Sequence, residues 1–313
     1  RTRRGVGVAV GYKNLMYSEG FDDTSEARAR LAGGVATVSI AVAEVGQGFV
    51  TVAGQIARTV LGCDAVVLEP PDSVLMGSAG SSSASRQTWM SGGAVERACR
   101  LVAEQVRSAY ARRLGLAPEA VTLTDDGHLV SAEGGPAVTV AEAAGDESFE
   151  ASAVHRHRPT VPLDGQGQGD ADVSFVFAAH RAVVDVDPDL GLVRVVQITT
   201  GQDVGRVLHP TQVIGQIEGG IAQGVGLAVM EEIVMDAGLV RNPSFTDYLI
   251  PTAADAPEVL ATCIEQPEPD APFGAKGVGE PPTISSTAAV AAAIRAATGV
   301  DVTRVPVRPW DLV

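Results

Sequence analysis

A single carboxylate near the C-terminal end is distinguished by its neighbours. Glu280 lies between a glycine-containing stretch at residues 274–279 and the stiff pair Pro281-Pro282. Proline fixes φ and is tolerated in the first turn of a helix, so the pattern places Glu280 at the entry of an Ala-rich helix predicted over residues 283–297. A carboxylate held there can act as a general base. The alternative is that the carboxylate complements the dipole of the helix N-terminus. Composition alone favours this second role.

A glycine-flanked amide forms a second candidate site. Gly46-Gln47-Gly48 follows a strand predicted over residues 35–44 and precedes a helix in which Val52, Ile56 and Val60 repeat at helical spacing. Backbone N–H groups and an amide side chain at such a junction can bind an anionic or polar ligand. The alternative is an ordinary turn between a strand and a helix.

A serine-rich loop over residues 77–85 is the third candidate. It leads into the longest predicted helix, over residues 88–114. Hydroxyls, exposed N–H groups and one guanidinium together suit phosphate binding, although a flexible surface loop would have the same composition. The candidate residues in and beside this loop are Ser81, Ser82, Ser83, Ser85, Arg86 and Gln87.

The helix predicted over residues 210–234 is rich in glycine. Each interior glycine costs about 0.5–1 kcal/mol relative to alanine, so this helix is expected to pack closely against a neighbour or a ligand. Gln216 and Gln223 are seven residues apart and share a face. Their amides could bind a heterocycle or form hydrogen bonds within a crowded core. The interior glycines are Gly215, Gly219, Gly220, Gly224 and Gly226.

The cysteines and histidines predict no metal ligated by protein side chains. The three cysteines, Cys63, Cys99 and Cys263, form no C-x-x-C pair, which excludes a disulfide framework and a thiolate zinc or iron–sulfur site. His155 and His157 share a face if extended, but no acidic or cysteine partner has ligand spacing nearby, so surface or packing roles are expected. A reducing, cytoplasmic location fits this usage best.

Composition narrows the class of protein. The 313 residues are 45% hydrophobic, enough for a large core, and carry a net charge of −15. Such a surface repels phosphate backbones and anionic lipid, so neither nucleic acid nor a membrane surface is an expected partner. The apolar runs are shorter than the roughly 20 residues of a spanning helix.

The remaining signals predict an α+β fold. Short strands are expected over residues 65–69 and 259–265, with hairpins over residues 121–130 and over 173–187 joined to 192–200. Residues 134–150 show little periodicity and are interpreted as a connection between two lobes, residues 1–150 and 151–313.

The order of four segments adds a resemblance to a known family. Glu44-Val45-Gly46-Gln47-Gly48, Ser85-Arg86-Gln87-Thr88, the glycine-rich run at residues 215–224 and Gly277-Val278-Gly279-Glu280-Pro281 stand in this order. That order resembles the xanthine dehydrogenase/aldehyde oxidase family of molybdenum hydroxylases, from near Gly5 to the end. The Ser-Arg-Gln-Thr segment and the tail Val305-Pro306-Val307-Arg308-Pro309 look most like bacterial xanthine dehydrogenase large subunits.

This resemblance implies the fold and the site. The fold would be the second molybdopterin-binding domain of a molybdenum hydroxylase, two α+β lobes with mixed sheets and packed helices. The metal would be ligated by cofactor sulfurs and by no protein side chain, and Glu280 would be the catalytic base. The implied cofactor-binding residues are Gly46, Gln47, Gly48, Ser81, Ser82, Ser83, Ser85, Arg86, Gln87, Gln216, Gly277, Val278 and Gly279.

The resemblance also implies activity and partners. The expected reaction is oxidative hydroxylation of a purine, hypoxanthine or xanthine, with water as oxygen donor. The alternatives are an aldehyde or other N-heterocycle dehydrogenase, or a non-catalytic pterin-binding module. The cofactor would be molybdenum-molybdopterin, with the cytosine dinucleotide form as one candidate. The expected hetero-oligomer includes [2Fe-2S] and FAD subunits and a chain with the first molybdopterin-binding half, whose Gly-Gly-Phe-Gly-Gly loop is absent here.

Overall fold

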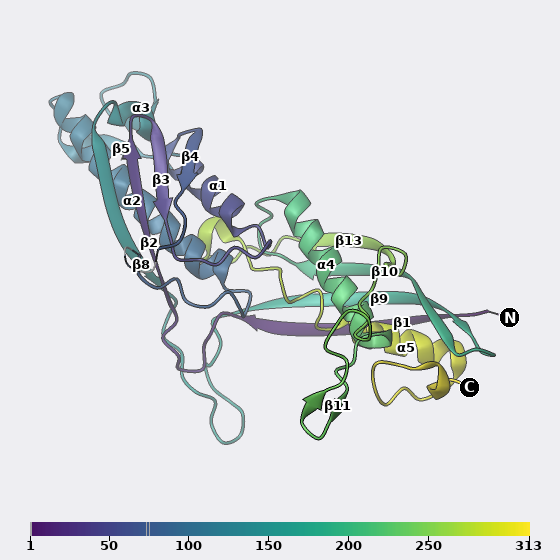
Figure 1. The fold of residues 1–313 in the computed structure, drawn as a ribbon. Coiled ribbons are helices and arrows are strands. Elements are labelled where there is room, and N and C mark those ends of the chain that lie inside the picture. The colour runs from purple at the N-terminus through teal and green to yellow at the C-terminus, as the bar shows by residue number, and fades with distance from the viewer. Residues whose placement is uncertain (1, 73, 75) are drawn as a thin grey trace. The chain divides into compact units, whose positions relative to one another are not determined.

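The chain forms two compact units, each built from separate stretches of sequence. The computed structural model describes residues 2–72, 74 and 76–313. Unit 1 contains Arg1–Asn14, Phe175–Gln266 and Val278–Val313, and unit 2 contains Leu15–Ser174 and Pro267–Gly277. Figure 1 traces the chain through both units. The division differs from the one expected at residue 150.

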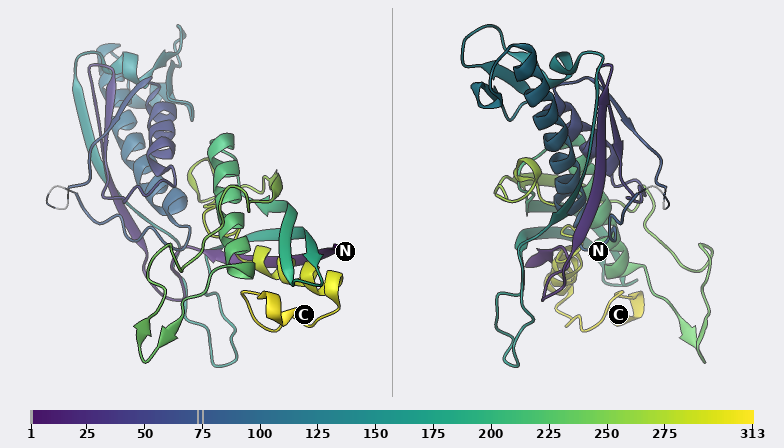
Figure 2. Two further views of the ribbon diagram at one scale, coloured as in Figure 1. Left: turned by 45° about the vertical axis from the view of Figure 1, so that its right-hand side comes forward. Right: turned by 90° about the vertical axis from the view of Figure 1, so that its left-hand side faces the viewer.

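Unit 2 is built on a four-stranded sheet with the order β4-β3-β2-β8. Strand β2 pairs antiparallel with both β3 and β8, whereas β3 pairs parallel with β4. Two helices, α1 and α2, pack against this sheet and supply much of its apolar core (Figure 2). The bounds are β2 (Thr24–Ala32), β3 (Val35–Ser39), α1 (Phe49–Leu61), β4 (Ala65–Leu68), α2 (Gln87–Arg113) and β8 (Ser148–Arg156).

The helices of unit 2 follow the sequence pattern closely. Helix α1 ends at Gly62, whose φ of 58° is left-handed and whose N–H donates to the carbonyl of Arg58. Helix α2 is the longest, with 27 residues, and its buried side includes the small residues Ala94 and Ala98. Small side chains let α2 pack close to the sheet. The helix predicted over residues 88–114 is confirmed, with each end shifted by one residue.

The sequence analysis interpreted residues 134–150 as a connection between two lobes, and the structure shows that this interpretation is wrong. They contain β7 and α3, and then the start of β8, which pairs with β2 along its whole length. Thr139 and Glu142 form a capping box at the start of α3, a local signal that hydrophobic periodicity alone does not reveal. The small elements are η1 (Pro118–Ala120), β5 (Val121–Leu123), β6 (His128–Ser131), β7 (Val138–Thr139), α3 (Val140–Ala144) and η2 (Pro272–Gly274).

Unit 1 is built on a second four-stranded sheet, with the order β1-β9-β10-β13. The hairpin of β9 and β10 is antiparallel as predicted and turns at Gly191, while β10 runs parallel to β13. Helices α4 and α5 share an apolar core with this sheet. The bounds are β1 (Arg3–Leu15), β9 (Ser174–Asp187), β10 (Leu192–Asp203), α4 (Pro210–Val229), β13 (Glu258–Ile264) and α5 (Ser286–Thr298).

Glycines set how closely α5 approaches β1. A Cβ atom at Gly5 would lie 2.1 Å from the carbonyl oxygen of Ala293, and one at Gly7 would lie 2.4 Å from that of Ala289. Both distances are far below van der Waals contact with backbone atoms, which cannot move aside. Glycine is therefore required on this face of β1.

The glycines of α4 divide into two sets. A Cβ at Gly220 would lie 2.7 Å from Pro282, and one at Gly224 would lie 1.9 Å from the hydroxyl oxygen of Ser286, so close packing is confirmed there. Gly215 and Gly219 have no atom within 4 Å of that position. These two glycines therefore border open space and do not pack against a protein neighbour, and the alternative of a ligand beside them stays a prediction.

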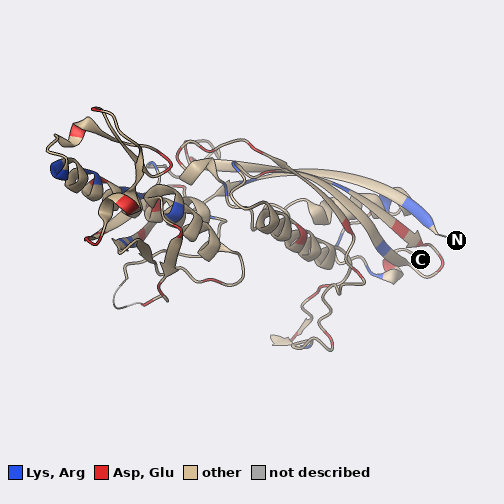
Figure 3. Cartoon of the chain, turned by 90° about the horizontal axis from the view of Figure 1, so that it is seen from above, with Lys and Arg blue, Asp and Glu red and all other residues tan. Residues whose placement is uncertain are grey.

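Several element ends differ from the prediction. Strand β3 ends at Ser39, and α4 ends at Val229, because Met230 has non-helical dihedral angles. The following segment contains the small hairpin of β11 (Met235–Asp236) and β12 (Leu239–Val240), and the chain closes with η3 (Pro309–Asp311). Among the described residues, none of the helices is both long and apolar enough to cross a membrane. Figure 3 shows acidic and basic residues dispersed over both units in that view.

Candidate functional site

Three predicted site residues of unit 2 form one hydrogen-bonded chain. The side-chain amide of Gln47 donates to the carbonyl oxygen of Ala43 at 2.9 Å and to the amide oxygen of Gln87 at 2.6 Å. Gln87 in turn donates to the hydroxyl oxygen of Ser82 at 2.7 Å. The glycine-flanked turn, the start of α2 and the serine loop are thereby joined, although they lie far apart in the sequence.

The Gly46-Gln47-Gly48 turn is organised by a carboxylate that the sequence analysis did not select. Glu44 accepts hydrogen bonds from the N–H groups of Gly46 at 2.8 Å, Gly48 at 3.1 Å and Val50 at 3.0 Å. Burial alone would raise the pKa of the Glu44 carboxyl, but these donors lower it overall. Gly46 and Gly48 have φ values of 101° and 87°, which glycine adopts without strain. The acidic residue two positions before the first glycine was the signal available in sequence.

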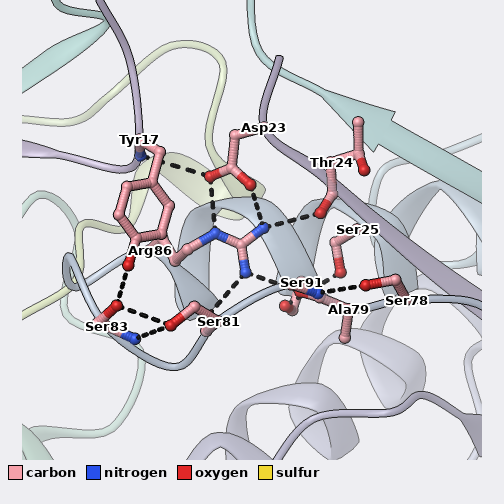
Figure 4. Close-up of polar contacts among 11 residues, drawn as sticks. Tyr17, Asp23, Thr24, Ser25, Ser78, Ala79, Ser81, Ser83, Arg86 and Ser91 are labelled. Carbon is pink, nitrogen blue, oxygen red and sulfur yellow. Dashed lines mark hydrogen bonds and ion pairs between the residues drawn. The ribbon is translucent and has the colours of Figure 1, made fainter. Parts of the chain in front are cut away.

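Arg86 holds the serine loop from inside the protein (Figure 4). Its guanidinium is fully buried and forms two parallel hydrogen bonds with the carboxylate of Asp23, both at 2.7 Å. It also donates to the carbonyl oxygens of Ala79 at 2.7 Å, Ser81 at 2.8 Å and Thr24 at 2.9 Å. All five guanidinium donors are thus used by the protein, so Arg86 shapes the loop and its guanidinium is not available to a phosphate.

The serine loop has a constrained backbone and exposed hydroxyls. Ala84 and Ser85 have φ values of 60° and 48°, an unfavourable region for residues with a side chain. Ser81 and Ser83 bond to each other at 2.7 Å, and Ser83 also bonds to the hydroxyl of Tyr17. Hydrogen bonds from Ser81 and Ser83 lower the pKa of Tyr17. The loop therefore presents a fixed set of hydroxyl groups.

Gly277 lies directly against this loop. A Cβ at Gly277 would be 1.9 Å from the carbonyl oxygen of Ser85, and Gly277 is buried. This contact connects the segment Pro267–Gly277 to the serine loop within unit 2. Gly277 is therefore required for backbone packing beside the candidate site.

In unit 1, Glu280 lies in a bend of the chain and not at a helix entry. Helix α5 begins only at Ser286, and Pro281 and Pro282 belong to the preceding turns, so the predicted start of this helix is wrong. The helix dipole acts within the first turn, which removes the main support for a purely dipolar role. The carboxylate of Glu280 lies 2.9 Å from the ammonium nitrogen of Lys13 on β1, and its side chain is 46% exposed.

The segment after Glu280 is anchored at two further points in unit 1. The hydroxyl of Thr283 donates to the carbonyl oxygen of Gly220 on α4 at 3.2 Å. Ser285 forms a hydrogen bond of 2.8 Å with Nδ1 of His180 on β9. His180 is 1% exposed, and burial lowers its pKa to about 4, so its ring is neutral at neutral pH.

The other predicted residues of unit 1 are Gln216, Val278 and Gly279. Gln216 lies near the N-terminal end of α4 and is half-buried, with open space at the neighbouring Gly215. Val278 is half-buried and Gly279 is exposed, and both precede Glu280 directly. The predicted site residues thus fall into two sets, one in each unit.

Metal-binding side chains do not cluster in the part of the chain that the structure describes. No group of three or more His, Cys, Asp or Glu residues is placed to hold a metal ion there. His155 is 6% exposed and packs on Trp89 with ring centroids 4.9 Å apart, as expected for a packing residue. Burial is the main cause that lowers the pKa of His155 to about 4.

Comparison with known proteins identifies similar sequences along almost the whole chain. The family model for the molybdopterin cofactor-binding domain matches residues 1–257. The xanthine dehydrogenase molybdenum-binding subunit of Escherichia coli O157:H7 is 30% identical over 323 residues, which cover 99% of this chain and 42% of that protein. The aldehyde oxidoreductase of Megalodesulfovibrio gigas is 31% identical over 317 residues, which cover 98% of this chain and 32% of that protein.

A solved structure shows the same arrangement of elements. Quinoline 2-oxidoreductase from Pseudomonas putida 86 superposes with a TM-score of 0.86 at 30% sequence identity, covering 99% of this chain and 41% of that one. The α+β architecture with mixed sheets is therefore shared. The chain spans between about a third and two fifths of the length of these relatives.

Proposed function

Because the chain belongs to the molybdopterin cofactor-binding family of molybdenum oxidoreductases, we propose that it is the cofactor-binding, catalytic portion of a hydroxylase. Its substrate is a purine, hypoxanthine or xanthine, and water donates the oxygen. The observation that carries this proposal is the placement of Glu280. This half-exposed carboxylate is held at a bend by flanking prolines and a lysine, outside any helix. A module that only binds a cofactor has no need of such a base.

The polar groups of unit 2 suit a pterin cofactor. Amide and hydroxyl groups of Gln47, Gln87 and Ser82 are joined in one network, and Gly46 has no atom within 4 Å of its Cβ position. Donors and acceptors of this kind suit a heterocycle and a phosphate. Since the guanidinium of Arg86 is occupied, phosphate would be bound by the hydroxyls and N–H groups of the loop that Arg86 shapes. The longer cytosine dinucleotide form is proposed as one candidate for the cofactor.

Gln216, Val278 and Gly279 of unit 1 are proposed as further cofactor-binding residues. Gln216 lies beside open space at Gly215 and Gly219, and Val278 and Gly279 lead directly into Glu280. When bound, the molybdenum–pterin group supplies the two-electron acceptor for the reaction. Ligands from this chain are not required for it, since its sulfurs ligate the metal.

Glu280 would move the proton in the reaction. Its carboxylate accepts a proton from the water-derived oxygen as that oxygen attacks an electron-poor ring carbon, which is general-base catalysis, typically worth about 10²–10⁴ in rate. The carboxylate is 46% exposed and can therefore be reached by substrate. The hydrogen bonds of Thr283 and Ser285 hold the backbone of the segment that follows it.

Further subunits would complete the enzyme. The chain spans 42% of the length of its xanthine dehydrogenase relative, and the proposed partners are a polypeptide with the first molybdopterin-binding half and subunits with [2Fe-2S] clusters and FAD. Electrons from the substrate would leave through those groups. A soluble, cytoplasmic hetero-oligomer is the proposed state.

A second candidate reaction is the oxidation of an aldehyde. The relative from Megalodesulfovibrio gigas, an aldehyde oxidoreductase, is 31% identical to the chain, and the same base would serve an aldehyde carbon. The two candidates are therefore separated by experiment.

The test uses the purified protein with its partner chains. Reduction is followed with hypoxanthine, xanthine, quinoline and benzaldehyde, in water enriched in ¹⁸O. The proposal expects molybdenum in the active material, reduction by a purine, and ¹⁸O in the hydroxylated product. Reduction by the aldehyde alone would select the second candidate. Active material without molybdenum, or loaded material that none of these compounds reduces, would contradict the proposed hydroxylase function.

A further inference from the structure

Lysine is rare in this chain, and one of its two lysines forms an ion pair with Glu280. Of the 23 basic residues, 21 are arginines, and Lys13 and Lys276 are the only lysines. Lys13 forms the ion pair with Glu280, and Lys276 lies four residues before Glu280 in the sequence. Arginine tends to bind both oxygens of a carboxylate, whereas a lysine ammonium acts as a point charge on one oxygen. A lysine therefore pairs with the proposed base in a chain whose basic residues are otherwise almost all arginines.

The surroundings of Lys13 fix its ammonium group. Lys13 lies near the end of β1, its side chain is 18% exposed, and Nζ also donates to the carbonyl oxygen of Asn14 at 2.7 Å. Glu280 and Lys13 belong to the same compact unit. The pair therefore joins the edge of the unit 1 sheet to the segment that carries the base.

This ion pair has little value for folding. Glu280 is nearly half exposed, and ion pairs with such access to water contribute little to the free energy of folding. Its geometric effect is larger, because the hydrogen bonds of Thr283 and Ser285 hold the backbone after Glu280, whereas Lys13 contacts the carboxylate. Lys13 contacts the carboxylate itself, which lies at the end of a side chain with three rotatable bonds.

We propose that Lys13 is a positioning residue that orients the carboxylate of Glu280 for proton transfer. The proposal rests on the proposed function, because it assumes that Glu280 is the base. Lys13 acts on one carboxylate oxygen through its charge and its fixed ammonium. It does not touch the substrate, so its loss affects the rate of the chemical step more than substrate affinity.

The geometry can be tested on the 313-residue chain without any cofactor. A zero-length carbodiimide activates a carboxylate, and a neighbouring amine then displaces the urea by-product to form an amide. Coupling of Lys13 to Glu280 would join the tryptic peptides 5–28 and 277–295, since the modified Lys13 is no longer cleaved. This cross-linked species should be abundant in the wild-type protein and absent from Lys13→Met. Its absence from the wild type would overturn the proposal.

The functional test is a mutant cycle in the molybdenum-loaded complex. Lys13→Met should slow the limiting rate of reduction by substrate about 10- to 100-fold, the range that a misplacement of about 1 Å brings, with little change in the substrate concentration needed for half-saturation. Arg4→Met is the matched control, since Arg4 is also on β1 and pairs with Asp185. It should change the rate less than about twofold.

The mutant cycle tests the positioning role of Lys13 separately from the catalytic role of Glu280. In a Glu280→Gln background, Lys13→Met should have little further effect, because both changes remove the same contribution. An equal slowing in both backgrounds would show that Lys13 acts independently of Glu280, which overturns the positioning role. An unchanged or faster rate in Lys13→Met alone would overturn it as well. A Glu280→Gln variant with normal reduction would refute the catalytic base and hence the proposed function.

Discussion

Gln47 and Gln87 share a hydrogen bond of 2.6 Å between their side-chain amides, although 40 residues separate them in the sequence. Gln87 is 7% exposed and starts α2, whereas Gln47 lies in the turn before α1. The bond therefore fixes the distance between the N-terminal ends of two helices. Because Gln87 also bonds to Ser82, a change at this one residue affects both loops of unit 2.

Gln87→Leu should lower cofactor content more than it lowers stability. The substitution removes the hydrogen bonds of Gln87 to Gln47 and Ser82, which costs about 0.5–1.5 kcal/mol each in the free energy of unfolding. Molybdenum content of the purified complex should fall several-fold, as measured by elemental analysis. Gln105→Leu on the same helix is the control, since Gln105 is exposed and bonds only to the carbonyl oxygen of Glu150. Equal molybdenum content in both variants would contradict a cofactor-binding role for Gln87.

Arg86→Met should destabilise unit 2 strongly. Removing one partner of a buried ion pair leaves the carboxylate of Asp23 uncompensated and costs about 3–5 kcal/mol. Urea unfolding measures this loss. Arg156→Met removes the exposed pair between Arg156 and Asp22 and should cost no more than about 1 kcal/mol. Similar midpoints for the two variants would show that the buried guanidinium does not organise the serine loop.

Glu280→Gln should retain the fold and molybdenum but lose most of the rate. The amide keeps the shape of the side chain and removes its basicity, so reduction by substrate should slow by about 10²–10⁴. Rapid-mixing absorbance of the loaded enzyme measures this step, with metal content determined on the same sample. A near-normal rate at full molybdenum loading would leave Glu280 with a structural role only.

Stability should fall as the pH decreases from about 6.5 towards 4. Burial lowers the pKa of His180 to about 4, so the folded state binds a proton less readily than the unfolded chain, whose histidines titrate near 6.5. The stabilisation is complete above the unfolded pKa and is lost as the pH falls through this window, by at most about 3 kcal/mol. Urea unfolding at pH 7 and pH 4.5 should show the loss, and His180→Gln should reduce it. An unchanged pH dependence in that variant would exclude His180 as a source.

Local signals in the sequence identified much of the fold, because they act between near neighbours. Gly62 and Gly299 end α1 and α5 in left-handed conformations, and the turn at Gly191 joins β9 to β10. Such positions depend on backbone conformations that only a few residue types adopt. The start of α5 was misplaced, since the packing of Pro282 against Gly220 is a tertiary effect, and the end of α4 was misplaced because periodicity does not reveal the non-helical dihedral angles of Met230.

The candidate site was predictable in residue type but not in role. The sequence selected Gln47, Gln87 and Ser82 separately, and only the fold connects them. It assigned the Arg86 guanidinium to a ligand, whereas Asp23, 63 residues away, occupies it. Lys13 was not selected at all, because 267 residues separate it from Glu280 and no local pattern marks the pair.

The division of the chain into units has a consequence for synthesis on the ribosome. Unit 1 needs Arg1–Asn14, Phe175–Gln266 and Val278–Val313, so β1 is synthesised long before α5, which packs against it. Unit 2 lacks only Pro267–Gly277 once residue 174 has emerged. Domains generally fold as units during translation. Unit 2 is therefore expected to fold while its polypeptide is still growing, whereas β1 stays without its helix until Ser286–Thr298 have been synthesised and needs protection from aggregation in that interval.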